Sequence, residues 1–153
     1  MAFLRVLYYF QLSCITFNVH ILTFPQPYVG YADGASHSTW NFCSAAWEIY
    51  APNHELVILQ GICIGFSTKN IVEDSMVIEF LSNAISRGIP HLVSILDSQL
   101  MVLHLNNVYS VRSPTMLHMF LRFHLLESHF DCIKYQHVPR SINKLTDELA
   151  KKK

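Results

Sequence analysis

Four acidic residues stand in separate parts of this chain, and together they have the chemistry of a divalent-metal site. Asp33 lies in Tyr-Ala-Asp-Gly-Ala-Ser, Glu73 in Asn-Ile-Val-Glu-Asp, Asp97 in Ser-Ile-Leu-Asp-Ser-Gln and Asp147 in Lys-Leu-Thr-Asp-Glu-Leu-Ala. Charged residues make up only 14% of the chain. A carboxylate placed where burial is expected is costly unless cations or strong hydrogen bonds compensate. The pattern therefore predicts one site assembled from distant segments.

The composition indicates one apolar domain, but the chain as a whole does not have the composition of a membrane protein. The chain has 153 residues, of which 51% are hydrophobic, and it has no net charge when its nine histidines are neutral. This length is enough to bury a core without disulfides or a structural metal. Because no basic field covers the whole chain, a surface that binds nucleic acid has to be local.

The cysteines predict neither a zinc site nor a disulfide framework. The four cysteines are widely spaced, at Cys14, Cys43, Cys63 and Cys132. None of them forms the Cys-x-x-Cys pair that is typical of zinc sites. We expect buried thiols in a reducing compartment.

Residues 1–27 differ from the rest and form a separate, unassigned apolar segment. No formal charge occurs between Arg5 and Asp33, which raises the alternative of a membrane anchor or a signal peptide. Polar residues interrupt the segment, and its longest apolar run near the start is 6–10, short of what a span or a signal needs. We predict an additional β-rich segment or the remnant of an upstream domain, with a domain at 28–153.

The remaining chain alternates between strand and helix patterns. Three consecutive strands joined by turns predict an antiparallel meander, and the later crossovers favour parallel neighbours. The predicted class is α/β, with a five-stranded mixed sheet flanked by helices. The predicted strands are 28–33, 42–50, 55–66, 91–96 and 131–138, and the predicted helices are 71–87, 98–105, 114–128 and 142–152.

These elements decide how each acid is interpreted. On a helical wheel Glu73 falls near the middle of the apolar arc of helix 71–87 and Glu79 falls on its polar face, so the wheel selects Glu73 over Glu79 and over Asp74. Thr68 and Asn70 are available as caps of this helix. Asp33 and Asp97 end strands, where α/β sheets form ligand sites. Each also has a structural alternative, since Asp33 precedes Gly34 in a turn-like pair and Asp97 could cap a helix.

Four motifs in order resemble those of type 1 ribonuclease H, in particular the domain found in plant long-terminal-repeat retrotransposon polyproteins. The resemblance covers about residues 28–150. Its motifs are Asp33-Gly34-Ala35-Ser36, Thr68-Lys69-Asn70-Ile71-Val72-Glu73, Asp97-Ser98-Gln99-Leu100, and His137-Val138-Pro139-Arg140 followed by Asn143-Lys144-Leu145-Thr146-Asp147-Glu148-Leu149-Ala150.

The resemblance implies a nuclease that cleaves the RNA strand of RNA-DNA hybrids with two metal ions. Asp33, Glu73, Asp97 and Asp147 would hold two Mg²⁺ ions, with Mn²⁺ as a substitute, and hard oxygen ligands suit such ions. Arg140 occupies the loop position at which many members have a catalytic histidine. His137 is a competing candidate, and we interpret it instead as a histidine at the end of an edge strand.

The resemblance also implies a substrate surface. Thr68, Lys69 and Asn70 would face the DNA strand, while Ser98 and Gln99 would face the RNA, whose 2′-hydroxyls mark it in the minor groove. This chain departs from the family where Lys69 replaces an asparagine, Asp74 an aromatic residue and Leu96 a glycine. Residues 37–41 replace a glycine-rich stretch.

Two other functions stay open on the sequence. One is a catalytically inactive remnant of a retrotransposon domain that binds nucleic acid, and the other, less favoured, is an integrase-like or transposase-like enzyme. Expected partners are an RNA-DNA hybrid and other domains of a retroelement polyprotein. We expect a monomer without a membrane role, in the cytoplasm or the nucleus.

Overall fold

The computed structural model of this chain describes residues 25–37, 42–106, 114–139 and 141, without the side chains of residues 36, 37, 100, 115 and 116. The described elements alternate in the predicted order. They are β1 (Tyr28–His37), β2 (Phe42–Tyr50), β3 (Leu56–Phe66), α2 (Lys69–Ser86), β4 (His91–Leu96), α3 (Gln99–Leu105), α4 (Pro114–Glu127) and β5 (Cys132–His137).

The five strands form one mixed sheet in the order β3-β2-β1-β4-β5. β1 pairs with β2 and β2 with β3 in antiparallel fashion, whereas β4 lies parallel to both β1 and β5. The predicted fold class is therefore confirmed, as is the meander of three strands. The predicted helix 142–152 lies outside the described residues.

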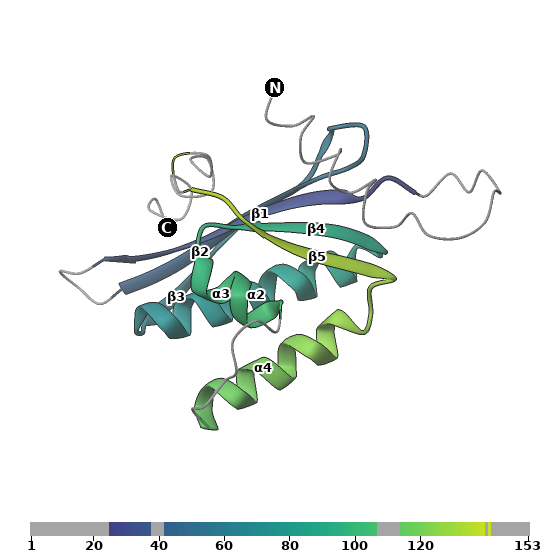
Figure 1. The fold of residues 1–153 in the computed structure, drawn as a ribbon. Helices are drawn as coiled ribbons and strands as arrows, with labels where there is room; N and C mark the ends of the chain where they lie inside the picture. The colour runs from purple at the N-terminus through teal and green to yellow at the C-terminus, as the bar shows by residue number, and fades with distance from the viewer. Residues whose placement is uncertain (1–24, 38–41, 107–113, 140, 142–153) are drawn as a thin grey trace.

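The three described helices lie on one side of the sheet (Figure 1). α2 runs along β1 and β2, α4 packs on α2, and α3 packs against β4 and β5. Apolar side chains from the sheet and from α2 fill the space between these layers. The largest fully buried ones are Trp47, Phe80, Ile49, Met76, Leu81, Leu92, Leu96, Val72, Val77 and Val93. None of the helices in the described ranges is long and apolar enough to cross a membrane.

Two glycines on β1 allow α2 to lie close to the sheet. A Cβ atom added at Gly30 would come within 2.5 Å of the Phe80 ring, and one at Gly34 within 2.9 Å of Val72 Cγ1. Both glycines therefore face α2. Because successive side chains on a strand point to opposite faces, Asp33 points to the face that α2 does not cover.

β1 is longer than the sequence predicts. We expected it to end at Asp33, with Asp33-Gly34 as a possible turn, but the strand continues to His37. The expectation is wrong because β1 stays paired with β2 up to the His37–Phe42 pair after β4 has left its other edge. Asp33 is therefore an interior strand residue.

The helix caps also differ in part from the prediction. Thr68 caps α2, and its hydroxyl accepts a hydrogen bond from the Ile71 amide at 3.5 Å. Asn70 lies within the helix and is not a cap. Ser98, rather than Asp97, caps α3. Asp97 is therefore the residue before the cap of this helix.

The expectation of buried thiols is only partly correct. Cys43 is buried and Cys132 half-buried, but Cys63 is exposed. Cys63 lies on β3, which is an edge strand that only β2 flanks. Cys14 lies outside the described residues.

Candidate functional site

Asp33 and Asp97 occupy equivalent positions on neighbouring parallel strands. The last paired residues of β1 and β4 are Ala32 and Leu96, and each acid follows directly. Asp33 is only 1% exposed, and both of its carboxylate oxygens are buried. Asp97 is half-buried. β1 and β4 therefore each have a carboxylate at the point where their pairing ends.

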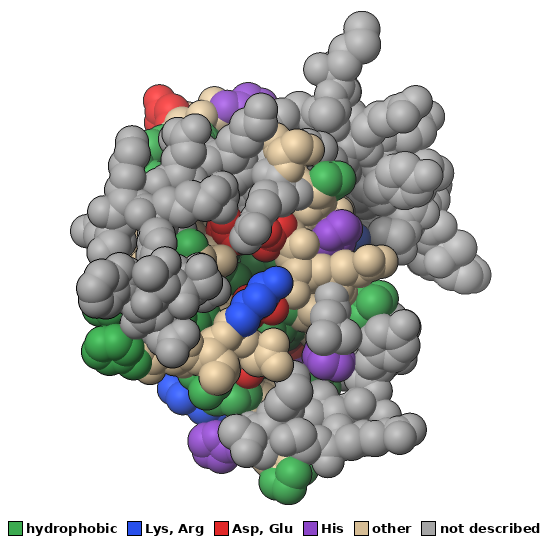
Figure 2. All heavy atoms as spheres, turned by 90° about the vertical axis from the view of Figure 1, so that its left-hand side faces the viewer, with side chains coloured by type: hydrophobic (Ala, Val, Ile, Leu, Met, Phe, Trp, Pro, Cys, Tyr) green, Lys and Arg blue, Asp and Glu red, His purple; other side chains and the backbone are tan. Residues whose placement is uncertain are grey.

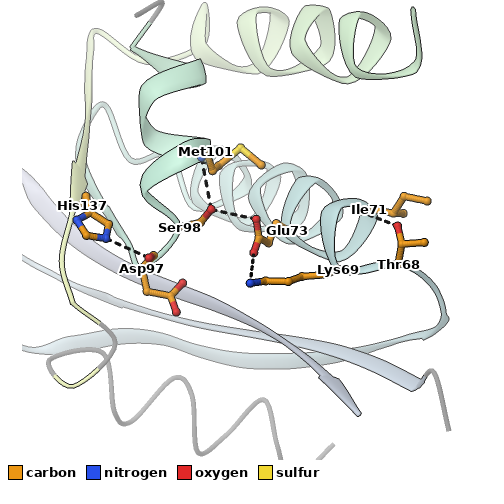
Figure 3. Close-up of polar contacts among 8 residues, drawn as sticks. All are labelled: Thr68, Lys69, Ile71, Glu73, Asp97, Ser98, Met101 and His137. Carbon is orange, nitrogen blue, oxygen red and sulfur yellow. Dashed lines mark hydrogen bonds and ion pairs between the residues drawn. The ribbon is translucent and has the colours of Figure 1, made fainter. Parts of the chain in front are cut away.

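Glu73 reaches the same region from the first turns of α2. The Ser98 hydroxyl donates a hydrogen bond to Glu73 Oε2 at 3.0 Å, and it also accepts one from the Met101 amide at 3.4 Å as the cap of α3. Figure 3 shows Glu73, Ser98 and Asp97 gathered between the start of α2 and the end of β4. Ser98 therefore links α3 to Glu73, a contact that the sequence did not predict.

The other oxygen of Glu73 faces a lysine. Lys69 Nζ lies 3.7 Å from Glu73 Oε1, one helical turn earlier on α2. The Lys69 side chain is 71% exposed, whereas that of Glu73 is 18% exposed. An exposed ion pair of this kind contributes only about 0.3–0.5 kcal/mol. Lys69 is therefore free to exchange Glu73 for another anion at little cost.

Asp74 is buried as well, which corrects the wheel argument. Only 5% of Asp74 is exposed, although the wheel selected Glu73 over it, while Glu79 is exposed as predicted. The buried arc is wider than expected because α2 packs against the sheet and against α4. Burial, followed by the neighbouring Glu73 carboxylate, raises the pKa of Asp74 to about 6.

His137 ends β5, the edge strand next to β4, as the sequence predicted. Its Nε2 atom lies 3.1 Å from the Asp97 carbonyl oxygen, which accepts the hydrogen bond when Nε2 carries the proton. Figure 3 shows this contact. The sequence interpretation missed it, because strands β4 and β5 had to be paired before the two residues could be placed together.

Four of the five residues expected to face the substrate lie at the surface, whereas Ser98 is half-buried. Thr68, Lys69, Asn70 and Gln99 are all exposed. In the space-filling view of this end of the molecule, acidic side chains lie beside a basic one near the centre (Figure 2). A polyanion approaching from this side would meet exposed donors before it reaches the carboxylates.

Two predicted site residues, Asp147 and Arg140, lie outside the described residues. Among the residues that are described, no three His, Cys, Asp or Glu side chains lie close enough to hold a metal ion together. Asp33 and Asp97 thus each follow the last pair between the neighbouring strands β1 and β4, and Ser98, the residue after Asp97, is hydrogen-bonded to Glu73, but these side chains form no closed cluster. Their donor atoms are all carboxylate oxygens, and such a set suits a hard divalent cation such as Mg²⁺.

Comparison with known proteins places the chain in a family. A family model described as reverse transcriptase-like matches residues 32–153. The chain belongs to the reverse transcriptase-like family. The crystal structure of ribonuclease H1 from Halobacterium salinarum is similar to this family member, with a TM-score of 0.77 and 28% identity over 82% of this chain and 96% of that one. The fold is that of ribonuclease H.

Other matches agree with this assignment. The ribonuclease H domain of Rv2228c from Mycobacterium tuberculosis has a TM-score of 0.76 and 27% identity, over 82% of this chain and 97% of that one. A compost-derived ribonuclease H1, solved in complex with an RNA/DNA hybrid, has a TM-score of 0.75 at 22% identity over 82% of this chain and 94% of that one, which is a likeness of fold.

The chain is shorter than the curated relatives that it matches. It is 28% identical over 120 residues to the bifunctional protein Rv2228c, which corresponds to 78% of this chain and 33% of that protein. The reverse transcriptase-like chain therefore spans about a third of that relative's length. It covers 60% of the ribonuclease HI of Halobacterium salinarum, at 29% identity.

Proposed function

We propose that this chain is an endonuclease that hydrolyses the RNA strand of RNA-DNA hybrids. One observation carries the proposal: Asp33 and Asp97 each follow the last pair between the parallel strands β1 and β4, and the Ser98 hydroxyl, next to Asp97, donates a hydrogen bond to Glu73. Three carboxylates in one region of a charge-poor chain need a cation to offset their repulsion. The likeness to a ribonuclease H1 and to the ribonuclease H domain of Rv2228c, at 27–28% identity over nearly the whole of the two solved chains, supports the same reaction class.

Asp33, Glu73, Asp97 and Asp147 would hold two Mg²⁺ ions, for which Mn²⁺ could substitute. When bound, such ions activate water and stabilise the leaving oxygen of an in-line displacement at phosphorus. The buried Asp33 fixes the position of the site relative to the sheet. Ser98 keeps one oxygen of Glu73 turned toward α3, and His137 holds the backbone at Asp97. Arg140 would stabilise negative charge on the phosphate through its permanent charge.

Exposed polar groups beside the carboxylates would bind the hybrid. Thr68, Lys69 and Asn70 would contact the DNA strand, and Gln99 the RNA strand. Ser98 was expected to contact RNA too, but its hydroxyl already makes two hydrogen bonds, so we assign it mainly to Glu73. We further propose that the chain acts as a monomer, alongside other domains of a retroelement polyprotein, in the cytoplasm or the nucleus.

A second candidate is an inactive domain that binds nucleic acid. It is favoured by the ion pair between Lys69 and Glu73. The Lys69 ammonium group lies beside the Glu73 carboxylate, which a divalent metal ion would have to bind for catalysis. Binding of hybrid without cleavage in the presence of Mg²⁺ would identify this function.

The deciding experiment measures Mg²⁺-dependent cleavage of a labelled hybrid by the full chain, with EDTA as the blank. Asp97→Asn and Glu73→Gln should each reduce cleavage at least 100-fold, since each removes a charged ligand. Asp131→Asn and Glu79→Gln are matched controls, because both acids are exposed and lie away from the site, and they should retain activity. Cleavage that persists in Asp97→Asn would refute the proposed site.

A further inference from the structure

β3 is an edge strand, and in the described part of the chain no strand lies beside its outer edge. Only β2 pairs with it in the sheet. The outward-pointing N–H and C=O groups of such an edge are available to pair with another strand. β3 is 11 residues long, and its sequence contains neither a charged residue nor a proline. Charges, prolines and short length are among the usual means by which proteins prevent edge pairing, and β3 has none of these three.

Two β-bulges limit the regular part of this edge. The register against β2 is continuous from Ile58 to Cys63, which is six residues. Val57 and Ile64 have no register partner on β2, and the register shifts there end the regular stretch. Six residues correspond to about 20 Å of strand, which is the length of an ordinary β-strand. The regular edge therefore has room for one short extended segment.

The two faces of β3 differ, and the difference determines which side chains a partner strand needs. Ile58 is buried in the core, and Gln60 Oε1 accepts a hydrogen bond from Asn83 of α2 at 2.8 Å. Side chains alternate along a strand, so Leu59 and Cys63 point to the face that the described helices do not cover. Leu59 is 50% exposed, and Cys63 is exposed as well. A partner strand thus meets apolar side chains on one face and a polar amide on the other.

We propose that the edge of β3 from Ile58 to Cys63 binds an extended, uncharged segment of a partner protein as an additional strand. The main chain of the segment pairs with the edge, and its alternate apolar side chains pack beside Leu59 and Cys63. The segment is uncharged because β3 has no opposite charge that would offset the lost hydration of an ion. This inference is independent of the nuclease activity proposed above.

A second copy of the chain fits this edge less well than a single segment does. Each copy has β3 fixed in its own sheet, and a bulge bends a strand away from a straight neighbour. Two copies could therefore pair only between the bulges. Such a contact alone is small beside the roughly 1,200–2,000 Å² that stable protein interfaces bury.

The test measures binding of a fluorescent peptide to the full chain by anisotropy. The peptide has alternating valines and threonines over the length of the regular edge, and a short polyethylene glycol chain keeps it soluble. Methylation of the backbone nitrogens along one edge of the peptide should abolish binding. Methylation along the other edge should leave the affinity within about twofold, because only one edge of a docked strand faces β3.

Variants of the protein place the peptide on β3. Leu59→Lys should weaken binding about tenfold or more, because it removes an apolar contact and puts a charge on the edge. Leu59→Val keeps an apolar side chain and should bind like the parent. Leu125→Lys puts the same charge on α4, where Leu125 is 68% exposed, and should also bind like the parent. Urea denaturation checks that each variant keeps its fold.

Four results would overturn the inference. The parent could fail to bind the peptide up to about 1 mM, or Leu59→Lys could bind it as tightly as the parent. Methylation of either edge of the peptide could have the same effect on the affinity. Finally, sedimentation could show a dimer of the parent that Leu59→Lys abolishes, which would make a second copy the partner of this edge.

Discussion

The Ser98 hydroxyl makes two contacts that a single substitution can separate from the rest of the site. It caps α3 and donates to Glu73. Ser98→Ala should lower the cleavage rate about tenfold, because a hydrogen bond to a charged group contributes about 1.5–3 kcal/mol. It should also lower stability by about 1 kcal/mol through the lost cap. Single-turnover cleavage and urea denaturation measure the two effects.

Ser98→Thr is the matched control, since threonine keeps the hydroxyl for both contacts. It should restore the rate and most of the stability. A rate in Ser98→Ala within twofold of the parent would mean that Glu73 does not depend on this hydrogen bond.

Glu48 carries a buried carboxyl on the same face of the sheet as Asp33. It is 6% exposed, and the Tyr50 hydroxyl donates to its Oε2 at 3.1 Å. Burial raises the pKa of Glu48 above 4.5, and the hydrogen bond from Tyr50 offsets part of this. The folded protein therefore binds the proton more tightly than the unfolded chain does. Its stability should fall as the pH rises from about 4.5 through the folded pKa.

Glu48→Gln removes the titration and keeps the shape and the acceptor. The variant should be more stable than the parent at pH 7, and the difference should shrink as the pH approaches 4. Urea denaturation between pH 4 and pH 8 measures this. A difference that does not change with pH would show that ionisation of Glu48 is not its cause.

Among the helices and strands, the sequence predicts best those whose bounds depend on the local residue pattern. The ranges 42–50 and 91–96 match β2 and β4 because both consist mainly of apolar residues. The end of β1 could not be predicted, since it depends on which neighbour stays paired. The burial of Asp74 could not be predicted either, because it depends on how α2 packs against the rest of the fold. Likewise, the bond between Ser98 and Glu73 appears only when α2 and α3 meet.

The close contact between β1 and α2 is possible because Gly30 has no side chain. An added Cβ would clash with the Phe80 ring, which is fully buried. Gly30→Ala should therefore lower the free energy of unfolding by about 1–3 kcal/mol, the usual cost of overpacking a core. Chemical denaturation measures the change.

A second substitution checks the cause. Adding Phe80→Leu to Gly30→Ala makes room for the methyl group, so the double variant should be more stable than the sum of the two single changes predicts. Strict additivity would place the effect of Gly30→Ala outside this contact.

For the whole molecule, a cation that binds the carboxylates should raise the melting temperature. Stabilisation by a ligand grows with its concentration relative to Kd. At about ten times Kd it amounts to about 1.4 kcal/mol, or roughly 3–5 °C for a domain of this size. Thermal melts with and without Mg²⁺ measure this shift independently of cleavage.

Two variants test whether the rise in melting temperature comes from Mg²⁺ bound at the carboxylates. Asp97→Asn should abolish it, whereas Asp131→Asn, at the opposite end of the β4–β5 pair, should keep it. An equal shift in both variants would indicate that Mg²⁺ acts on the general charge of the protein instead. Because the chain has no net charge, such a general effect is expected to be small.

The placement of Asp33 between Gly30 and Gly34 restricts how this chain can evolve. Side chains alternate along β1, so one residue gained or lost between Tyr28 and Asp33 would turn the acid toward α2 and change which residues meet Phe80. A substitution alters one position, whereas a change of length moves every following side chain of the strand to the opposite face of the sheet. Lineages that keep the site should therefore vary β1 by substitution while its spacing stays fixed.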